Sequence, residues 1–262
     1  MKVCVLASGS KGNACFIKTA SHNILIDLGI SCRQLDSRLK QIGEKTEEID
    51  ILLITHEHTD HISGLGTFLS KVKPSIYTTS KTMDKIYRKF PDLKDYELFY
   101  PVKKDDIVTF NDLEIKCIET FHDASEPLGF VIKEKEKKLV YITDTGYIHS
   151  KDYSSISNAD CYILESNHDP EVLMMSNRPY DLKRRILSDK GHLSNVDSAI
   201  CLAYVLGRKT KTIVHAHISE ECNCLELVSK TYQEVLESFS FKMYDFEFIF
   251  AKQNEITKVI EV

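Results

Sequence analysis

Three histidines and one aspartate stand within six positions of each other, in the run His56-Glu57-His58-Thr59-Asp60-His61. Imidazole nitrogens are good ligands for Zn²⁺, Mn²⁺ and Fe, and a nearby carboxylate lets a site keep a bound water. His56 and His58 can face one side of the chain, with Asp60 and His61 facing the other. The run therefore predicts ligands for metal ions; the alternative is a solvated polar loop.

Two metals need more than four ligands, and later parts of the chain offer three candidates of suitable type. His122, Asp144 and His217 each follow a segment that we expect to be a strand. Each has an ordinary alternative, because histidines at strand ends are often merely polar and Asp-Thr-Gly is a common turn. Together they would complete two ligand sets, with His215 as the fallback for His217.

At this point the sequence resembles the metallo-β-lactamase superfamily. That resemblance implies an α/β fold, the αββα metallo-β-lactamase sandwich, in which two mixed β-sheets pack face to face with helices outside. It also implies two bound metals and one ligand set for each. The first metal would be held by His56, His58 and His122. The second would be held by Asp60, His61 and His217.

The resemblance assigns two further aspartates. Asp144 would bridge the two metals. Asp27, at the end of the run NILIDL, would support the histidine-rich loop from behind without touching metal, which is a common role for a carboxylate beside a ligand histidine.

A narrower set of segments is similar to the YycJ/WalJ family. Those segments are residues 8–13, 122–130, 143–146, 165–169, 178–195 and 216–223. The family implies a metal-dependent exonuclease acting 5′ to 3′ on duplex DNA, cytosolic and linked to mismatch repair, so that repair proteins are possible partners. The chain departs from the family where Ile218 replaces leucine and Cys222 stands where the first of two asparagines is expected. Asn223 fills the second place.

The expected chemistry is hydrolysis of a phosphodiester by a metal-bridging hydroxide, with Asp60 in the reacting centre. The departing 3′ oxygen then needs a proton, and His192 and His168 are imidazoles left over from the metal sets. We expect His192 to contact the substrate or act as general acid. The alternative for His192 is a position beside a helix cap formed by Ser194 or Asn195.

Two segments could bind the DNA backbone. The glycine-rich turn SGSKGN offers Ser8, Ser10 and Asn13 as donors, or it is simply a tight connection after a strand. The segment 178–190 carries five basic residues against two acidic ones, in a chain of net charge −5. Arg184 and Arg185 there would contact phosphates, unless the segment is a solvated helix face.

Alternating apolar segments predict the elements that position these residues. We expect strands at 2–7, 14–19, 23–28, 50–55, 75–79, 107–110, 113–120, 128–134, 138–143, 161–166 and 212–216. We expect helices at 32–42, 64–72, 81–90, 180–188, 195–206 and 224–238. The segments FEFIFA and ITKVIEV near the end should form a closing pair of strands.

Composition limits the class of protein. The chain has 262 residues, 42% of them hydrophobic and 28% charged, which suits one globular domain over 1–262. No apolar run reaches the roughly 18 residues of a membrane span, and the first apolar run is too short for a signal peptide. We therefore expect a cytoplasmic protein that binds no membrane. The eight cysteines form no CxxC pair and predict no disulfide framework.

Other functions fit the same ligands. A cyclic or small-molecule phosphodiesterase, a tRNA-processing endonuclease, or a thioester or β-lactam hydrolase could use this metal centre. A non-catalytic regulatory metal-binding protein is an alternative of another class. The sequence leaves open which of Zn²⁺, Mn²⁺ or Fe is bound, and the oligomeric state.

Overall fold

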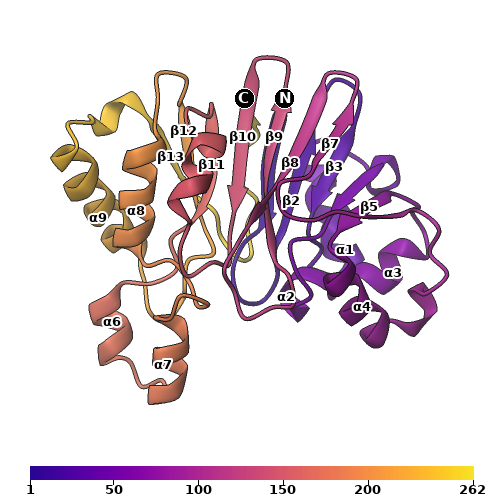
Figure 1. Ribbon diagram of the computed structural model, residues 1–262, viewed down its shortest axis with the longest axis horizontal. Helices are drawn as coiled ribbons and strands as arrows, with labels where there is room; N and C mark the ends of the chain where they lie inside the picture. The colour runs from indigo at the N-terminus through magenta and orange to yellow at the C-terminus, as the bar shows by residue number, and fades with distance from the viewer. The chain divides into compact units, whose positions relative to one another are not determined.

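The computed structural model describes residues 1–262, and the chain forms two compact units (Figure 1). The first unit comprises Met1–Glu119, Ala124–Leu128 and Lys252–Val262. The second comprises Thr120–Asp123 and Gly129–Ala251. The prediction of a single domain over 1–262 stays a prediction.

A seven-stranded mixed sheet of order β14-β1-β2-β3-β4-β5-β6 lies in the first unit. Its strands are β1 (Lys2–Ala7), β2 (Ala14–Lys18), β3 (Asn23–Ile26), β4 (Ile51–Leu53), β5 (Ser75–Thr78), β6 (Phe99–Pro101) and β14 (Ile260–Glu261). The pairs from β14 to β3 are antiparallel and those from β3 to β6 are parallel. Every residue of β4 is buried, as its unbroken apolar run predicts.

A second seven-stranded mixed sheet has the order β13-β12-β11-β10-β9-β8-β7. Its strands are β7 (Ile107–Phe110), β8 (Leu113–Glu119), β9 (Leu128–Glu134), β10 (Lys137–Ile142), β11 (Cys161–Glu165), β12 (Thr212–Ala216) and β13 (Glu247–Phe250). β9 and β10 form the predicted antiparallel hairpin, and the pairs from β10 to β13 are parallel. Parallel strands end at the same edge, so β10, β11 and β12 deliver their following residues to one place.

Two helices of the first unit have clear sequence signals at their ends. The helices of this unit are α1 (Cys32–Gln41), α2 (Thr59–Ile62), α3 (Leu65–Leu69) and α4 (Ser80–Lys89). Ser31 and Gln34 form a reciprocal capping box at the start of α1, and Leu35 and Leu39 bury its apolar face. α4 is capped by the Thr79 side chain and ends before Pro91, as expected.

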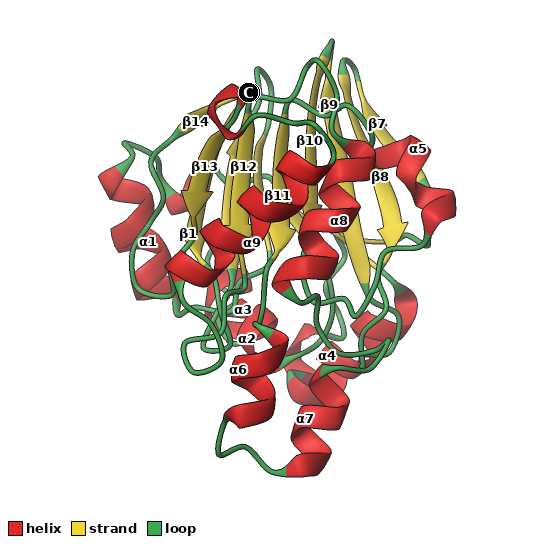
Figure 2. Ribbon diagram, turned by 90° about the vertical axis from the view of Figure 1, so that its left-hand side faces the viewer, coloured by secondary structure: helices red, strands yellow, loops and turns green.

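The second unit holds α5 (Tyr153–Ile156), α6 (Pro170–Met175), α7 (Tyr180–Ile186), α8 (Asn195–Val205) and α9 (Leu225–Ser238). α8 and α9 pack against each other and cover strands of the second sheet (Figure 2). α6 and α7 lie side by side beyond the ends of β11 and β12 in both views (Figures 1 and 2). No helix has the length and apolar character needed to cross a membrane.

The predicted pair of closing strands is wrong. β13 pairs in parallel with β12, so that Thr212 lies opposite Glu247, whereas β14 pairs with β1 at Lys2 and Glu261. The two segments are similarly apolar and close in sequence, but each completes the edge of a different sheet. The short strand β6 and the helices α2, α5 and α6 were also not predicted, because they span only three to six residues.

Candidate metal centre

Three predicted site residues share an uncommon backbone conformation. Asp27, Asp144 and His217 follow strands β3, β10 and β12, and their φ angles are 58°, 55° and 52°. L-residues other than glycine rarely adopt this left-handed conformation, and it clusters at functional sites. At each of these three residues the extended backbone of the strand has ended.

The histidine-rich loop follows β4 in the first unit and gathers three imidazole rings. The ring centroids of His56 and His58 are 4.6 Å apart, and those of His56 and His61 are 4.1 Å apart. His56 and His61 are buried, and His58 lies at the N-terminal end of α2. Asp60, in the first turn of α2, is partly exposed.

A buried carboxylate holds the loop from behind. Asp27, 0% exposed, accepts hydrogen bonds from the backbone N–H and the hydroxyl of Thr55, both at 2.8 Å. His61 Nδ1 lies 2.8 Å from Asp27 Oδ2, and Thr55 Oγ1 lies 3.0 Å from His56 Nδ1. Burial raises the pKa of Asp27, while the neighbouring His61 opposes that shift. Both histidines thus have Nδ1 occupied by the protein, which directs Nε2 to any further ligand.

Glu57, inside the same loop, serves a different purpose. Its Oε1 accepts hydrogen bonds from the backbone N–H and hydroxyl of Ser125, at 2.9 and 2.6 Å. Glu57 Oε2 also accepts a bond from the Thr82 hydroxyl at 3.4 Å. The Glu57 carboxylate therefore links the histidine-rich loop to two other segments of the first unit.

The glycine-rich turn reaches this loop through Asn13. Its amide exchanges hydrogen bonds with the backbone of Gly9, and its Nδ2 lies 3.3 Å from Asp60 Oδ2. Gly29 is required nearby, because a Cβ there would lie 1.5 Å from the Asp60 carbonyl oxygen. Of the predicted donors, Ser8 is buried and Ser10 is exposed.

The second unit holds its own cluster of donors. One ligand atom from each of Asp144, Glu165, His192 and His217 lies within 4.8 Å of the others. Glu165, 0% exposed, accepts hydrogen bonds from His192 Nδ1 at 2.7 Å and His217 Nδ1 at 2.9 Å. Its second oxygen accepts from the Thr145 backbone at 2.9 Å. Glu165 thereby fixes the orientation of two imidazoles.

The charge state of Glu165 follows from these contacts. Burial alone would raise its pKa, but the charge and hydrogen bond of His192 and the hydrogen bond of His217 outweigh burial. The pKa of Glu165 is lowered to about 2. Glu165 is therefore an ionised acceptor at neutral pH.

The Nδ1 atom of His122 also lies within hydrogen-bond distance of a protein oxygen, as in His56, His61 and His217. It is buried, and its Nδ1 lies 3.0 Å from the Gly191 carbonyl oxygen. Burial lowers the pKa of His122, even though Asp144 raises it, so the ring is held in the neutral form that binds metals.

Two other histidines lie apart from this cluster of donors. His168 is 1% exposed, neither of its ring nitrogens has a hydrogen-bond partner, and burial lowers its pKa to about 4. His215 is also buried. Its ring stacks on Phe248 and Phe250, and its Nδ1 lies 3.2 Å from Ser166 Oγ. The fallback His215 is therefore not in the donor cluster, whereas His217 is.

Three asparagines link the loops that carry the second cluster. The amides of Asn195 and Asn223 exchange hydrogen bonds at 2.8 and 2.9 Å. Asn223 Nδ2 also lies 2.9 Å from the Ser166 carbonyl oxygen, and Asn167 donates at 2.9 Å to the carbonyl of His217. We call Asn167, Asn195 and Asn223 the asparagine cluster. It joins the end of β11, the start of α8 and the segment after β12.

The departure at Cys222 has a simple structural account. Cys222 is 1% exposed and packs with Leu173 and Ile186 in a small apolar cluster beneath α6 and α7. Asn223 alone makes the side-chain amide hydrogen bonds of this segment. The cysteine at position 222 therefore removes no hydrogen bond from the asparagine cluster.

Three of the five basic side chains in residues 178–190 form ion pairs or hydrogen bonds within the protein. Arg178 pairs with Glu221 at 2.9 Å, and Arg185 pairs with Asp123 at 2.5 Å. Lys183 donates to the carbonyls of Met174 and Ser176, at the end of α6. Exposed Arg184 and Lys190 keep side chains without a partner.

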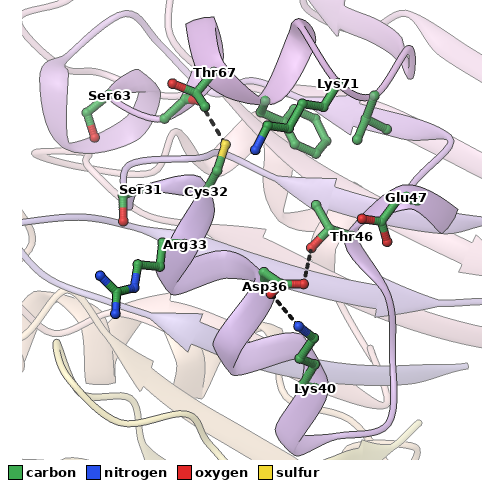
Figure 3. Close-up of a pocket in the computed structure, with 13 residues that line it drawn as sticks. Ser31, Cys32, Arg33, Asp36, Lys40, Thr46, Glu47, Ser63, Thr67 and Lys71 are labelled. Atoms are coloured by element: carbon green, nitrogen blue, oxygen red, sulfur yellow. Dashed lines mark hydrogen bonds and ion pairs between the residues drawn. The ribbon is translucent and has the colours of Figure 1, made fainter.

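A separate hollow of about 550 Å³ lies in the first unit (Figure 3). Cys32, Asp36, Thr46 and Lys71 are among its lining residues, and none of the predicted site residues is. Burial raises the pKa of Cys32, against the opposing charge of Lys71, so this thiol is poorly suited to act as a nucleophile.

Solved structures share this fold. The metallo-β-lactamase fold protein YhfI from Bacillus subtilis matches with a TM-score of 0.71 over 97% of this chain and 98% of its own, at 17% identity. Human tRNase Z, short form, matches with a TM-score of 0.66 over 100% of both chains, at 18% identity. The predicted fold class, that of the metallo-β-lactamases, is confirmed.

Sequence relatives narrow the assignment. A model of the "Beta-lactamase superfamily domain" matches residues 22–216. Exodeoxyribonuclease YycJ of Bacillus anthracis is 38% identical over 240 residues, which are 90% of this chain and 89% of that protein. Exodeoxyribonuclease WalJ of Streptococcus pneumoniae is 37% identical over 251 residues, 93% of each. The chain belongs to the metallo-β-lactamase superfamily and, within it, to the YycJ/WalJ family.

The histidine and aspartate clusters of both units are typical of the dinuclear metal site of this superfamily. Sequence reasoning missed Glu165 and the asparagine cluster. The signal for Glu165 was present, because an acidic residue ends the fully buried strand CYILE, where an unpaired carboxylate would be costly.

Proposed function

We propose that this protein is a metal-dependent hydrolase that degrades duplex DNA from the 5′ end, an exodeoxyribonuclease. Relatives with that name match about 90% of the chain at 37–38% identity. The observation that carries the proposal is the anchoring of four imidazoles. Nδ1 of each ring lies 2.8–3.0 Å from a protein oxygen, in His56, His61, His122 and His217. A hydrogen bond at Nδ1 fixes the orientation of each ring and directs its Nε2 away from that oxygen, as in histidines that bind metal ions.

The residues fit two divalent ions, Zn²⁺, Mn²⁺ or Fe. We assign the ions to the donors that the superfamily pattern names. These donors are His56, His58, Asp60, His61, His122, Asp144 and His217. Bound there, the ions would supply a nucleophile at neutral pH and offset charge on the phosphodiester oxygens.

Within this function His192 is the proton donor. It is part-exposed, unlike the four anchored histidines, and its Nδ1 is bound to ionised Glu165. The Glu165 carboxylate stabilises the imidazolium form of His192, and the Nε2 proton of that ring can then pass to the 3′ oxygen as the P–O bond breaks, which leaves a neutral ring. His168, fully buried, is the weaker candidate for this role.

We also propose which residues contact the DNA and where the protein acts. Ser10 of the glycine-rich turn and Arg184 are the proposed contacts to the DNA backbone, while Ser8, Asn13 and Arg185 have structural partners. We propose a cytoplasmic protein that acts with repair proteins, in mismatch repair.

The test is digestion of linear duplex DNA labelled at its 5′ end, with Mn²⁺, with Zn²⁺ or with chelator. We expect release of mononucleotides from the 5′ end, abolished by chelator and by Asp60→Ala. Absence of release with either metal, from protein that holds two ions per chain, would contradict the proposal. Activity on small or cyclic phosphodiesters would then point to the phosphodiesterase alternative.

A further inference from the structure

Helices α6 and α7, with their connection and the segment to Lys190, form an arm of the second unit, residues 170–190. In both views the connection between the two helices is at the end of the arm far from the strands (Figures 1 and 2). Met175 ends α6 and Tyr180 begins α7, so both residues flank that outer connection.

The outer end of the arm is apolar and exposed. Met175 is 86% exposed and Tyr180 is 67% exposed, and Met174, next to Met175, is also among the exposed large hydrophobic residues of the chain. An exposed patch of this kind, on an element that buries other apolar residues well, marks a binding surface. The inner side of the arm does bury its apolar residues, because Leu173 and Ile186 pack with Cys222.

The arm is built rigidly onto the proposed site. The Gly191 carbonyl that ends the arm accepts the hydrogen bond of His122 Nδ1, and the next residue is His192. Arg185 pairs with Asp123, beside His122, and Gly146 leaves room only for the backbone of Asp189. The arm therefore holds its outer end at a fixed place relative to His122 and His192.

Charge on the arm favours a polyanion as the occupant. The arm carries five basic residues against the acidic Glu171, Asp181 and Asp189, whereas the whole chain has a net charge of −5. Arg184 and Lys190 are exposed, have no partner in the structure and lie in sequence between the apolar end and His192. A ligand that offers a flat apolar surface at one end and negative charge along its side would match both features. The end of a duplex is such a ligand, since the last base pair exposes a stacking face and the strands carry phosphates.

We propose that the arm binds the end of duplex DNA, with Met175 and Tyr180 packed on the last base pair and Arg184 and Lys190 on the phosphates. This proposal rests on the proposed nuclease function. Residues 180–186 of α7 alone span about 9 Å, the length of about three stacked nucleotides. The arm thus keeps the last base pair a few nucleotides from His192, and the 5′ strand crosses that distance unpaired.

The chain contains no tryptophan, which permits a direct test. Tyr180→Trp in the metal-loaded protein gives a single tryptophan at the end of the arm, and phosphorothioate linkages protect the DNA ends from digestion. We expect linear duplex to quench this emission, and covalently closed circular duplex at equal phosphate not to. Tyr244→Trp, at a tyrosine 78% exposed in the short helix 243–245, is the matched control and should respond to neither.

A second measurement tests the unpaired segment. We expect Met175→Ser/Tyr180→Ser to digest blunt, fully paired duplex about tenfold more slowly, as the loss of one stacking contact implies. Three unpaired nucleotides at the 5′ end should restore its rate to near that of the unaltered protein. Tyr244→Ser should digest both substrates normally.

The outcomes separate the two proposals. Quenching by circular and linear DNA alike, or a rate that unpaired ends do not restore, would overturn end recognition while the nuclease function stands. Emission that shifts with protein concentration alone would assign the arm to a second copy of the chain. Quenching by DNA ends without any digestion would support the arm and contradict the nuclease function.

Discussion

At the scale of single residues, the site depends on carboxylates that hold imidazoles. Asp27 holds His61, and Glu165 holds both His192 and His217. Such partners fix the tautomer and direction of a ring, and they raise its basicity as a metal ligand. The two carboxylates are fully buried, so each is stabilised by the hydrogen bonds it accepts and by the charge of its histidine partner.

Glu165→Gln tests that dependence, because the amide carries no charge and its N–H₂ group would face either the two histidines at Oε1 or the backbone N–H of Thr145 at Oε2. We expect metal affinity to fall about 10- to 100-fold and the free energy of unfolding to fall by about 1–3 kcal/mol. Chelator competition and urea denaturation measure the two. Glu221→Gln, at an exposed surface pair, should leave both unchanged; equal effects of the two substitutions would contradict the role of Glu165.

His168 predicts a dependence of stability on pH. Burial lowers its pKa to about 4 from an ordinary value of 6.5, so below pH 6.5 the unfolded chain binds a proton that the folded chain does not. Its contribution to stability is therefore complete above pH 6.5 and is lost as the pH falls toward 4, at about 1.4 kcal/mol per pH unit.

Urea denaturation of the metal-free protein between pH 7.5 and 4.5 measures this slope. We expect His168→Gln to reduce it by about that amount, compared with the unaltered chain in the same buffers. An unchanged slope would show that the ring of His168 is protonated in the folded protein.

At the scale of elements, strand ends and the connections between them decide the geometry. Asp144 follows the end of β10 and His217 follows the end of β12, both with left-handed backbone, while the asparagine cluster fixes the segments that follow β11 and β12. Helix α8 starts at this place, with the Ser194 hydroxyl as its cap. Hydrogen bonds from side chains to the backbone position loops in this way, because such loops have no regular backbone hydrogen bonds to a neighbouring strand.

Asn223→Ala would leave the Ser166 carbonyl and the Asn195 amide without their partner. We expect a loss of about 1–3 kcal/mol in the free energy of unfolding, together with weaker metal binding, because Asn167 and His217 lose their support. Urea denaturation and chelator competition give both values. Asn254→Ala, at an exposed position near the C-terminal end, is the control; a stability loss without any change in metal affinity would make the cluster purely structural.

At the scale of the whole molecule, the chain returns to its first unit at the end. Residues 252–262 belong with Met1–Glu119, and β14 pairs with β1 at the far end of the sequence. The Val5 backbone donates to Thr257 Oγ1 at 3.0 Å, and Arg38 Nη1 donates to the carbonyls of Leu6 and Gln253. These contacts between distant parts of the sequence explain why its last strands could not be paired by proximity.

The sequence by itself determined the elements and the chemical types at the site. Apolar alternation gave the long strands and helices, and the run from His56 to His61 gave metal chemistry, because side-chain period and ligand type are local properties. The tertiary structure decided what depends on distant segments. The left-handed backbone at His217 places that residue, and not His215, in the donor cluster, and His168 is buried. Arg185 forms an ion pair with Asp123, and Glu165 accepts hydrogen bonds from two histidines. Such contacts arise only when strands far apart in sequence end at one edge of a sheet.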